Sequence, residues 1–197
     1  YIPLDMDVSP FDNSKTKKEG VSRTYKGCDG YAPMFGYLGT EGYLINVELR
    51  NGSQHCQKNT PAFIQEILKL TRQITQKPLL IRLDSGNDSQ DNFEVIDKWK
   101  DIDVLVKRNL RKESLVGWFN LAQNTEDIKL TRCKHKSVWV GQTTVDPKGK
   151  SLPRPIVFKV TERYEKKGEP LLIPEIEVET YWITIAGLSP QEVINLY

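Results

Sequence analysis

The sequence predicts a mixed α/β fold, with a five-stranded mixed sheet, flanking helices and a β-rich segment that follows them. Three strand patterns joined by short turns come first, and helix and strand patterns then alternate up to residue 106, an order that produces a mixed sheet. After residue 110, three further stretches alternate apolar and polar residues or run in β-branched residues, which is typical of added strands. Two of the early strand patterns also end on an aspartate.

The first part of the predicted sheet is an antiparallel meander. Ile2–Val8 alternates buried-type and acidic residues, as a strand with one buried face does. Ser9–Gly27 is polar and lysine-rich without apolar periodicity, so we expect an exposed loop. Tyr31–Leu38 predicts the second strand, and its internal proline and glycine indicate an edge or a bulge. A short turn leads to Tyr43–Leu49, which predicts a hairpin.

Helices and strands alternate in the next part. Thr60 followed by Pro61 predicts a helix start, because proline favours the first helical position. Apolar residues up to Ile74 then give this helix one broad face. The elements expected after it are a strand at Leu79–Leu83, a helix at Asn92–Trp99 and a strand at Val104–Val106.

The character of the chain changes after Leu110. The expected elements are a helix at Glu113–Asn124, strands at Ser137–Val145, Pro155–Tyr164 and Glu177–Ile185, turns at 146–149 and 166–168, and a final helix capped by Ser189. We therefore predict a core at 1–109, a β-rich basic insertion at 110–186, and the start of a returning core helix at 187–197.

Charge is spread unevenly along the chain. Residues 107–168 hold 15 basic and 6 acidic side chains, whereas the remainder holds 13 and 20. A basic segment in an acidic body favours a nucleic-acid partner, and a solvated basic surface is the plain alternative. No apolar run is long enough for a membrane span, so we expect no membrane partner and a cytoplasmic location.

Cysteine usage indicates a reducing compartment. The three cysteines are odd in number and widely spaced, so they do not form a disulfide framework. His55-Cys56 and Cys133-x-His135 suggest a zinc site only weakly, since no C-x-x-C pair is present.

Two aspartates mark the candidate chemistry. Asp7 ends the first strand pattern and Asp84 ends the fourth, while Asp5 lies on the same strand face as Asp7. Carboxylates on rigid neighbouring strands suit Mg²⁺ or Mn²⁺, which prefer hard oxygen ligands. Taken singly, each aspartate is also an ordinary strand-end or turn residue.

Five short motifs carry a family resemblance. They are Leu4–Asp7 (L-D-x-D), Asp7–Ser9 (D-x-S), Lys18–Gly20 (K-E-G), Leu49–Ser53 (L-R-x-G-S) and Arg82–Gly86 (R-x-D-S-G). In this order and spacing the chain resembles the DDE transposases of bacterial insertion sequences, specifically those with a β-strand insertion between the second and third catalytic acids.

The resemblance implies a ribonuclease H-like fold in which strand one lies centrally beside strand four, bringing Asp7 and Asp84 together. It implies a two-metal site holding Mg²⁺ or Mn²⁺, with Asp7 bridging both ions and Asp84 and Asp5 as further candidate ligands. A third acid, a glutamate, would follow the motif that Tyr197 begins, so we expect an internal fragment that is inactive alone. Two departures are Ser9, where threonine is commoner, and Asn87, where the family usually has an aromatic residue.

The activity implied is DNA cleavage at transposon ends and transfer of the 3′ end into target DNA, with double-stranded DNA as partner and a possible homodimer of the full-length protein. Phosphate contacts are expected from basic residues that follow strands one, three and five. These are Lys15, Lys17, Lys18, Arg50, Lys107, Arg108, Arg111 and Lys112. Trp118, Phe119 and Trp139 would stack on unpaired bases or, as the stronger expectation, pack in the core of the insertion.

Two other classes of protein remain open from the residues alone. A phosphoacceptor receiver domain also has acids at strand ends and a lysine after strand five, but it needs a helix between strands one and two, where Ser9–Gly27 predicts none. A non-catalytic DNA-binding or assembly module with the same fold is the other alternative.

Overall fold

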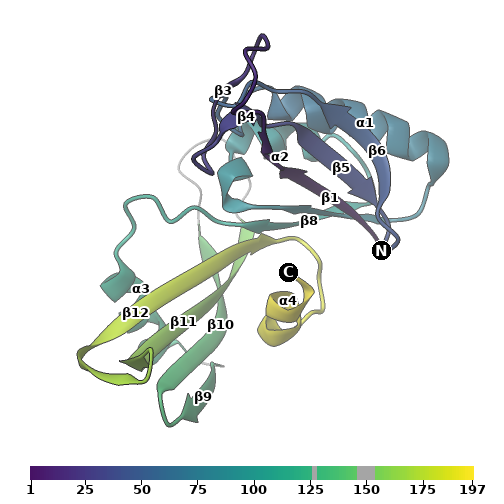
Figure 1. Cartoon of the computed structure of the whole chain (residues 1–197). Coiled ribbons are helices and arrows are strands. Elements are labelled where there is room, and N and C mark those ends of the chain that lie inside the picture. The colour runs from purple at the N-terminus through teal and green to yellow at the C-terminus, as the bar shows by residue number, and fades with distance from the viewer. Residues whose placement is uncertain (126–127, 146–153) are drawn as a thin grey trace. The chain divides into compact units, whose positions relative to one another are not determined.

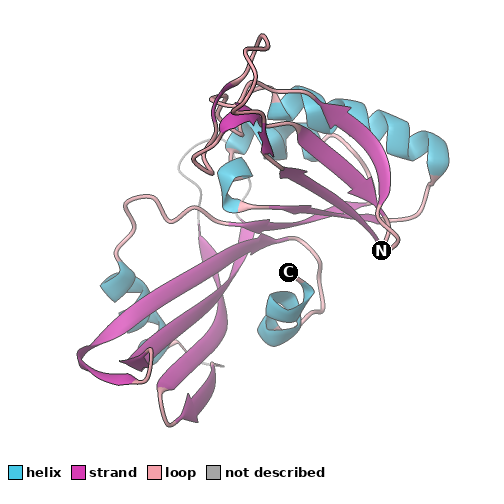
Figure 2. Cartoon of the chain, viewed as in Figure 1, coloured by secondary structure: helices cyan, strands magenta, loops and turns pink. Residues whose placement is uncertain are grey.

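The structure is a computed structural model that describes residues 1–125, 128–145 and 154–197. The chain divides into two compact units, Tyr1–Val106 and Lys107–Tyr197. The turn expected at 146–149 lies outside the described residues. Strands and helices occur in both units, so the predicted mixed α/β class is confirmed (Figures 1 and 2).

The first unit is built on a mixed sheet with the strand order β6-β5-β1-β7-β8. Its strands are β1 (Ile2–Val8), β5 (Met34–Leu38), β6 (Tyr43–Glu48), β7 (Leu79–Leu83) and β8 (Ile102–Lys107). β1 pairs antiparallel with β5 on one side and parallel with β7 on the other, and β7 pairs parallel with β8. The first predicted strand therefore lies beside the fourth, as expected.

The antiparallel pairing of β5 with β1 excludes the alternative of a phosphoacceptor receiver domain. β5 follows β1 in the sheet as an antiparallel neighbour. Between the two strands the chain forms no helix, only short strands and turns. A receiver domain needs a helical crossover at that point to bring in a parallel strand.

Helix α1 (Thr60–Ile74) fixes the core of the first unit. It begins at Thr60, where the sequence predicts the helix start. Asn59 is its N-cap residue, and Pro61 occupies its first turn. Phe63, Ile64 and Ile67 are fully buried on its inner face. Gly36 of β5 lies against this face, because a Cβ atom there would come within 1.9 Å of the Ile67 Cδ1 atom. The expected irregularity in this strand is confirmed by a register shift after Gly36.

Helix α2 (Gln90–Ile96) and the short 3-10 helix η1 (Ser85–Asn87) separate β7 from β8. α2 is displaced toward the N-terminus compared with the prediction of 92–99. Residues 97–99 continue as turns, in which the Trp99 N–H donates to the Ile96 carbonyl. Phe93 and Ile96 supply the buried side of this helix.

The lysine-rich segment after β1 is more structured than expected. It contains β2 (Phe11–Asp12) and β3 (Ser22–Arg23), which pair on either side of β4 (Asp29–Tyr31) in a separate small sheet. The expected strand at 31–38 is accordingly divided between β4 and β5 at Pro33. Strands of two residues have too little periodicity to be recognised in a sequence.

In its described residues, the second unit is an antiparallel sheet of β12-β11-β10-β9 with two helices. Its elements are α3 (Leu115–Asn124), β9 (Lys129–Cys133), β10 (Lys136–Val145), β11 (Arg154–Lys166), β12 (Glu169–Ile183) and α4 (Pro190–Leu196). The three predicted strands are present, β12 begins earlier than expected, and β9 was not predicted. Ser189 and Glu192 form the capping box of α4.

Aromatic residues of the second unit pack in its core. Trp118 and Trp139 are 8% and 7% exposed. Trp118 lies 5.7 Å from the ring of Phe158, and Trp139 meets Phe119 edge to face at 5.2 Å. These contacts favour the core role over base stacking. Among the described residues, no helix is long and apolar enough to cross a membrane.

Candidate active site

The alternation of buried and exposed side chains along β1 places Asp7 on the face of the sheet opposite the buried residues. Leu4, Met6 and Val8 are buried at 0%, 2% and 6% exposure, so the intervening acidic side chains point to the other face of the sheet. Asp7 comes one residue before the strand ends, and its carboxylate Oδ1 accepts the backbone N–H of Val8 at 2.7 Å. This contact fixes one carboxylate oxygen at the edge of the sheet.

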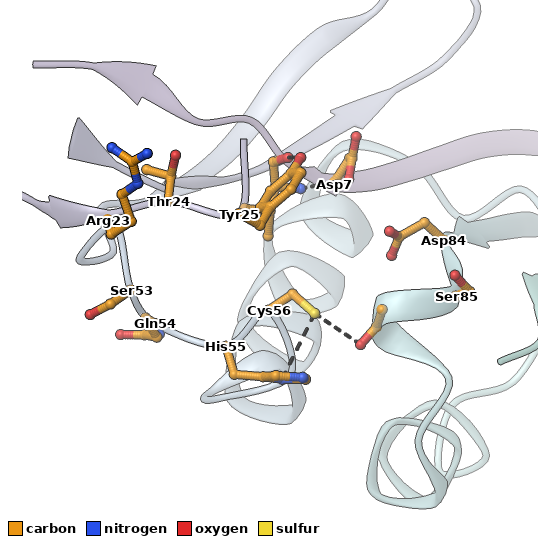
Figure 3. A pocket seen from close by; sticks show the side chains of 13 residues that line it. Asp7, Arg23, Thr24, Tyr25, Ser53, Gln54, His55, Cys56, Asp84 and Ser85 are labelled. Carbon is orange, nitrogen blue, oxygen red and sulfur yellow. Dashed lines mark hydrogen bonds between the residues drawn. The ribbon is translucent and has the colours of Figure 1, made fainter. Parts of the chain in front are cut away.

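Asp84 is delivered to the same edge by β7. The parallel register pairs Met6 with Leu83, so the next residue of each strand is an aspartate. Asp7 and Asp84 both line a pocket of about 540 Å³ in the first unit. Figure 3 shows their side chains on the same side of this pocket. The structure therefore confirms the prediction that Asp7 and Asp84 lie at one site; their role there remains a prediction.

The electrostatics of the pair are those of two crowded carboxylates. Partial removal from water raises the pKa of Asp7, the N–H of Val8 opposes this rise, and the negative charge of Asp84 adds to it. The positive charge of Lys26 acts in the opposite direction. A divalent cation between the carboxylates would relieve this repulsion, which makes the pair suited to a metal ion.

A chain of amide side chains holds Asp84. The Asn87 Nδ2 atom donates to Asp84 Oδ1 at 2.8 Å. Asn92 donates to the backbone carbonyl of Asn87 at 2.7 Å, and its amide exchanges two hydrogen bonds with Gln57. Asn87 and Asn92 are each 1% exposed. The asparagine that departs from the family pattern is thus a buried support of the second aspartate.

Tyr25, His55 and Cys56 also line this pocket. The Cys56 thiol donates to the carbonyl of Gly86 at 3.0 Å, and burial followed by the charge of Asp84 raises its pKa. His55 Nδ1 accepts the N–H of Gln57 at 3.1 Å. A thiol kept neutral in this way is a packing and hydrogen-bonding group rather than a nucleophile.

Asp5 is not part of the pocket, which corrects its prediction as a metal ligand. Its two carboxylate oxygens each accept a hydrogen bond from the guanidinium of Arg82, both at 2.6 Å. This bidentate pair lies directly between neighbouring strands, since Asp5 and Arg82 are register partners. The charge of Asp5 is therefore already matched within the sheet.

Two arginines predicted to contact phosphate are buried, so that prediction was wrong for them. Arg50 is 2% exposed and donates to Glu48 at 2.6 Å and to the Cys56 carbonyl at 2.7 Å. Arg108 is 9% exposed, and its guanidinium pairs with Glu113 at 2.7 Å. The sequence shows where a charged side chain stands, but not whether the fold will bury it against an acidic partner.

The remaining predicted phosphate contacts are accessible to different degrees. Lys107 of the second unit is half-buried and donates to Glu179 at 2.9 Å. The other members of the set are exposed: Lys15, Lys17, Lys18, Arg111 and Lys112. Their role in binding DNA stays a prediction.

Arg50 also shapes the pocket by holding the turn that carries Cys56. The neighbouring Gly52 has no room for a side chain, because a Cβ atom there would lie 2.1 Å from the Ser22 carbonyl oxygen and 2.3 Å from that of Gly30. The Ser53 N–H donates to the Ser22 hydroxyl oxygen at 2.9 Å. The L-R-x-G-S motif therefore locks one wall of the pocket to the small sheet.

Sequence reasoning missed the contributions of Tyr25, Cys56 and Asn87. Tyr25 and Cys56 stand in segments without periodicity, and only the fold brings them to the pocket. Asn87 offered one signal, namely its departure from an aromatic residue directly after the second aspartate motif. Among the described residues, no group of three or more His, Cys, Asp or Glu side chains is arranged to hold a metal ion, so neither suggested zinc site is assembled.

Comparisons with known proteins give structural likeness without sequence similarity. No protein family and no curated protein matches the sequence. The fold resembles a piggyBac transposase, seen in a synaptic complex with hairpin DNA, at 9% identity and a TM-score of 0.48 over 99% of this chain. It also resembles the NurA nuclease of Sulfolobus solfataricus at 7% identity and a TM-score of 0.33, covering 99% of this chain and 70% of the nuclease. This chain spans 37% of the length of the transposase chain.

Proposed function

We propose that the chain is the catalytic region of a DDE-type transposase with a ribonuclease H-like core, which uses divalent metal ions to cleave and transfer DNA phosphodiester bonds. One observation carries the proposal. Asp7 and Asp84 stand at the ends of adjacent parallel strands and line one pocket. The transposase motifs around both residues agree with this placement.

The donor atoms present fit Mg²⁺ or Mn²⁺. Asp7 and Asp84 each accept one hydrogen bond through Oδ1, from Val8 and Asn87 respectively. No described residue donates a hydrogen bond to the Oδ2 atom of either carboxylate. Two carboxylate oxygens held in this way are hard ligands on rigid strands. They make up an incomplete ligand set, which the third acid implied by the family resemblance would extend.

Each residue has a distinct part in the proposed chemistry. When bound, divalent ions activate an attacking water or 3′-hydroxyl and neutralise charge on the leaving oxygen. Asp7 and Asp84 hold and orient the ions, while Val8 and Asn87 orient the two carboxylates. The protonated Cys56 keeps the Gly86 carbonyl in place beside Asp84 and forms no covalent intermediate.

A nicking assay on supercoiled plasmid with Mg²⁺ or Mn²⁺ tests the proposal, in a protein that carries this chain together with the third acid that the family resemblance implies. Cleavage is expected to need the metal and to fall to background in Asp7→Asn and Asp84→Asn. The matched control is Asp101→Asn, which removes a carboxylate next to β8 at the opposite ends of the parallel strands. Its left-handed backbone, with φ of 55°, accepts asparagine without strain.

The outcomes separate catalysis from binding alone. Metal-dependent nicking that survives in both Asp7 and Asp84 variants would overturn the assignment of the site. DNA binding without any nicking by the wild type, unchanged in those variants, would favour the non-catalytic DNA-binding module. The absence of a third assembled acid among the described residues is the observation on that side.

A further inference from the structure

The tip of the β3–β4 hairpin is a rigid loop at the edge of the pocket. Thr24, which is 4% exposed, donates to the Cys28 carbonyl through both its backbone N–H and its hydroxyl, each at 2.9 Å. The Gly27 N–H donates a hydrogen bond to the Thr24 carbonyl at 3.0 Å. Gly27 adopts a φ of 83°, a conformation that favours glycine. These bonds close the loop, so the side chains at its tip are positioned before any ligand arrives.

Tyr25 stands at this tip with its ring accessible and its hydroxyl tethered. The side chain is 70% exposed, yet its hydroxyl donates to the Val8 carbonyl at 3.2 Å, directly after Asp7. Figure 3 shows the ring beside Asp7 at the pocket. An isolated exposed tyrosine is unremarkable, but this one is held in place next to the candidate metal ligands.

Two basic residues flank the tyrosine. Arg23 pairs with Asp29 at 3.5 Å, a long contact in which the arginine side chain is 69% exposed. Such an exposed pair contributes little to stability and can be exchanged for a phosphate. Lys26 is exposed and lies near enough to Asp7 for their charges to interact. The tip thus combines an aromatic face with two exposed cations around the carboxylate pocket.

We propose that this tip, Arg23–Lys26, binds an unpaired nucleotide next to the bond that is cleaved: Tyr25 stacks on the base, while Arg23 and Lys26 contact the adjacent phosphates. The ligand class is a single-stranded or frayed nucleic-acid end. An aromatic face accepts any base, and cations at its sides follow the backbone, which is how sequence-independent strand binding is built. This inference rests on the proposed function, because the site of cleavage defines its location.

The tip offers what the tryptophans of the second unit do not. Trp118 and Trp139 are buried, so neither presents a face to a base. The hydrogen bond to Val8 also links the position of Tyr25 to the strand that carries Asp7. A base stacked on Tyr25 would therefore be aligned with the carboxylate pocket without a change in the fold.

Fluorescence anisotropy with a labelled thymidine 12-mer in EDTA tests the proposal. Tyr25→Ala is expected to weaken binding by about tenfold, which is near the lower end of the range for one stacked base. Tyr25→Phe keeps the stacking face and should stay near wild type. Tyr43→Ala is the matched control, because Tyr43 is 65% exposed on β6 and does not line the pocket. Arg23→Gln should reduce the slope of log K against log salt by about 0.7, as for one lost phosphate contact on a single strand.

Further arms distinguish this proposal from the proposed function. Asp7→Asn and Asp84→Asn should bind the 12-mer at least as tightly as wild type in EDTA, so a failure of cleavage does not affect this test. A blunt duplex should bind without dependence on Tyr25. Equal affinity of wild type and Tyr25→Ala, equal losses in the Tyr25 and Tyr43 variants, or no binding of the 12-mer at all would overturn the inference.

Discussion

Asn87→Leu separates support of the proposed metal site from stability of the fold. The substitution keeps the number and branching of the side-chain heavy atoms but removes the amide that donates to Asp84 Oδ1 at 2.8 Å. It also removes the Asn87 Oδ1 atom, which is buried and has no hydrogen-bond partner among the described residues. The two losses act in opposite directions on the free energy of unfolding.

The magnitudes follow from these contacts. A hydrogen bond to a charged group contributes about 1.5 to 3 kcal/mol, and the low end applies because Asp84 faces an open pocket where water replaces the donor. Removal of a buried unpaired carbonyl returns about 1 kcal/mol. The free energy of unfolding should therefore fall by only about 0.5 kcal/mol. Loss of a group that orients a metal ligand, in contrast, typically weakens metal binding by about tenfold or more.

Calorimetric titration with Mn²⁺ and equilibrium unfolding in urea measure the two effects. The control is Ile67→Val, which trims a fully buried side chain of α1 away from the pocket and should cost about 1 kcal/mol. Asn87→Leu should lose metal affinity with little change in stability, and Ile67→Val should do the reverse. Wild-type Mn²⁺ affinity in Asn87→Leu would refute the role given to this amide.

Three further outcomes are expected. Gly86→Ala places a Cβ atom 2.7 Å from the Cys56 sulfur and 3.3 Å from a carboxylate oxygen of Asp84, so Mn²⁺ titration should show weaker binding. Asp7→Asn should raise the urea midpoint at pH 7, because burial followed by repulsion raises the pKa of Asp7 in the folded state; this gain should vanish as the pH falls below the ordinary value of 3.8. Glu179→Gln should lower the stability of the second unit by about 1 to 2 kcal/mol at pH 7, a value discounted because a third of the side chain is exposed. Burial disfavours the Glu179 carboxylate, but hydrogen bonds from two lysines outweigh it and lower its pKa from 4.5 to about 2, so in wild type this contribution should be lost as the pH falls through that range.

Local pattern predicted the parts of the site that periodic strands position. β1 and β7 have clear apolar patterns with an aspartate just before or just after the strand end, and parallel pairing of the two strands then brings Asp7 beside Asp84. The helix α1 and the hairpin of β5 and β6 were predictable for the same reason, since their apolar spacing or short connection is visible in the sequence.

Other features depend on contacts that apolar periodicity does not reveal. Arg50 is buried because Glu48 and the Cys56 carbonyl take its guanidinium, and Arg108 because Glu113 pairs with it while Trp182 lies 4.7 Å beneath. In the sequence, Arg50 and Arg108 cannot be distinguished from the lysines that the structure leaves exposed. Tyr25 reaches the pocket through a hairpin whose strands have only two or three residues.

The central claim is that Asp7 and Asp84 jointly bind a divalent metal ion, and paramagnetic broadening by Mn²⁺ in a ¹H–¹⁵N NMR spectrum tests it most directly. At substoichiometric Mn²⁺, the amide signals of Val8 and of Ser85 to Asn87 should broaden first, and this selectivity should disappear in both Asp7→Asn and Asp84→Asn. Broadening that starts elsewhere, or that persists at these amides in both variants, would contradict the account.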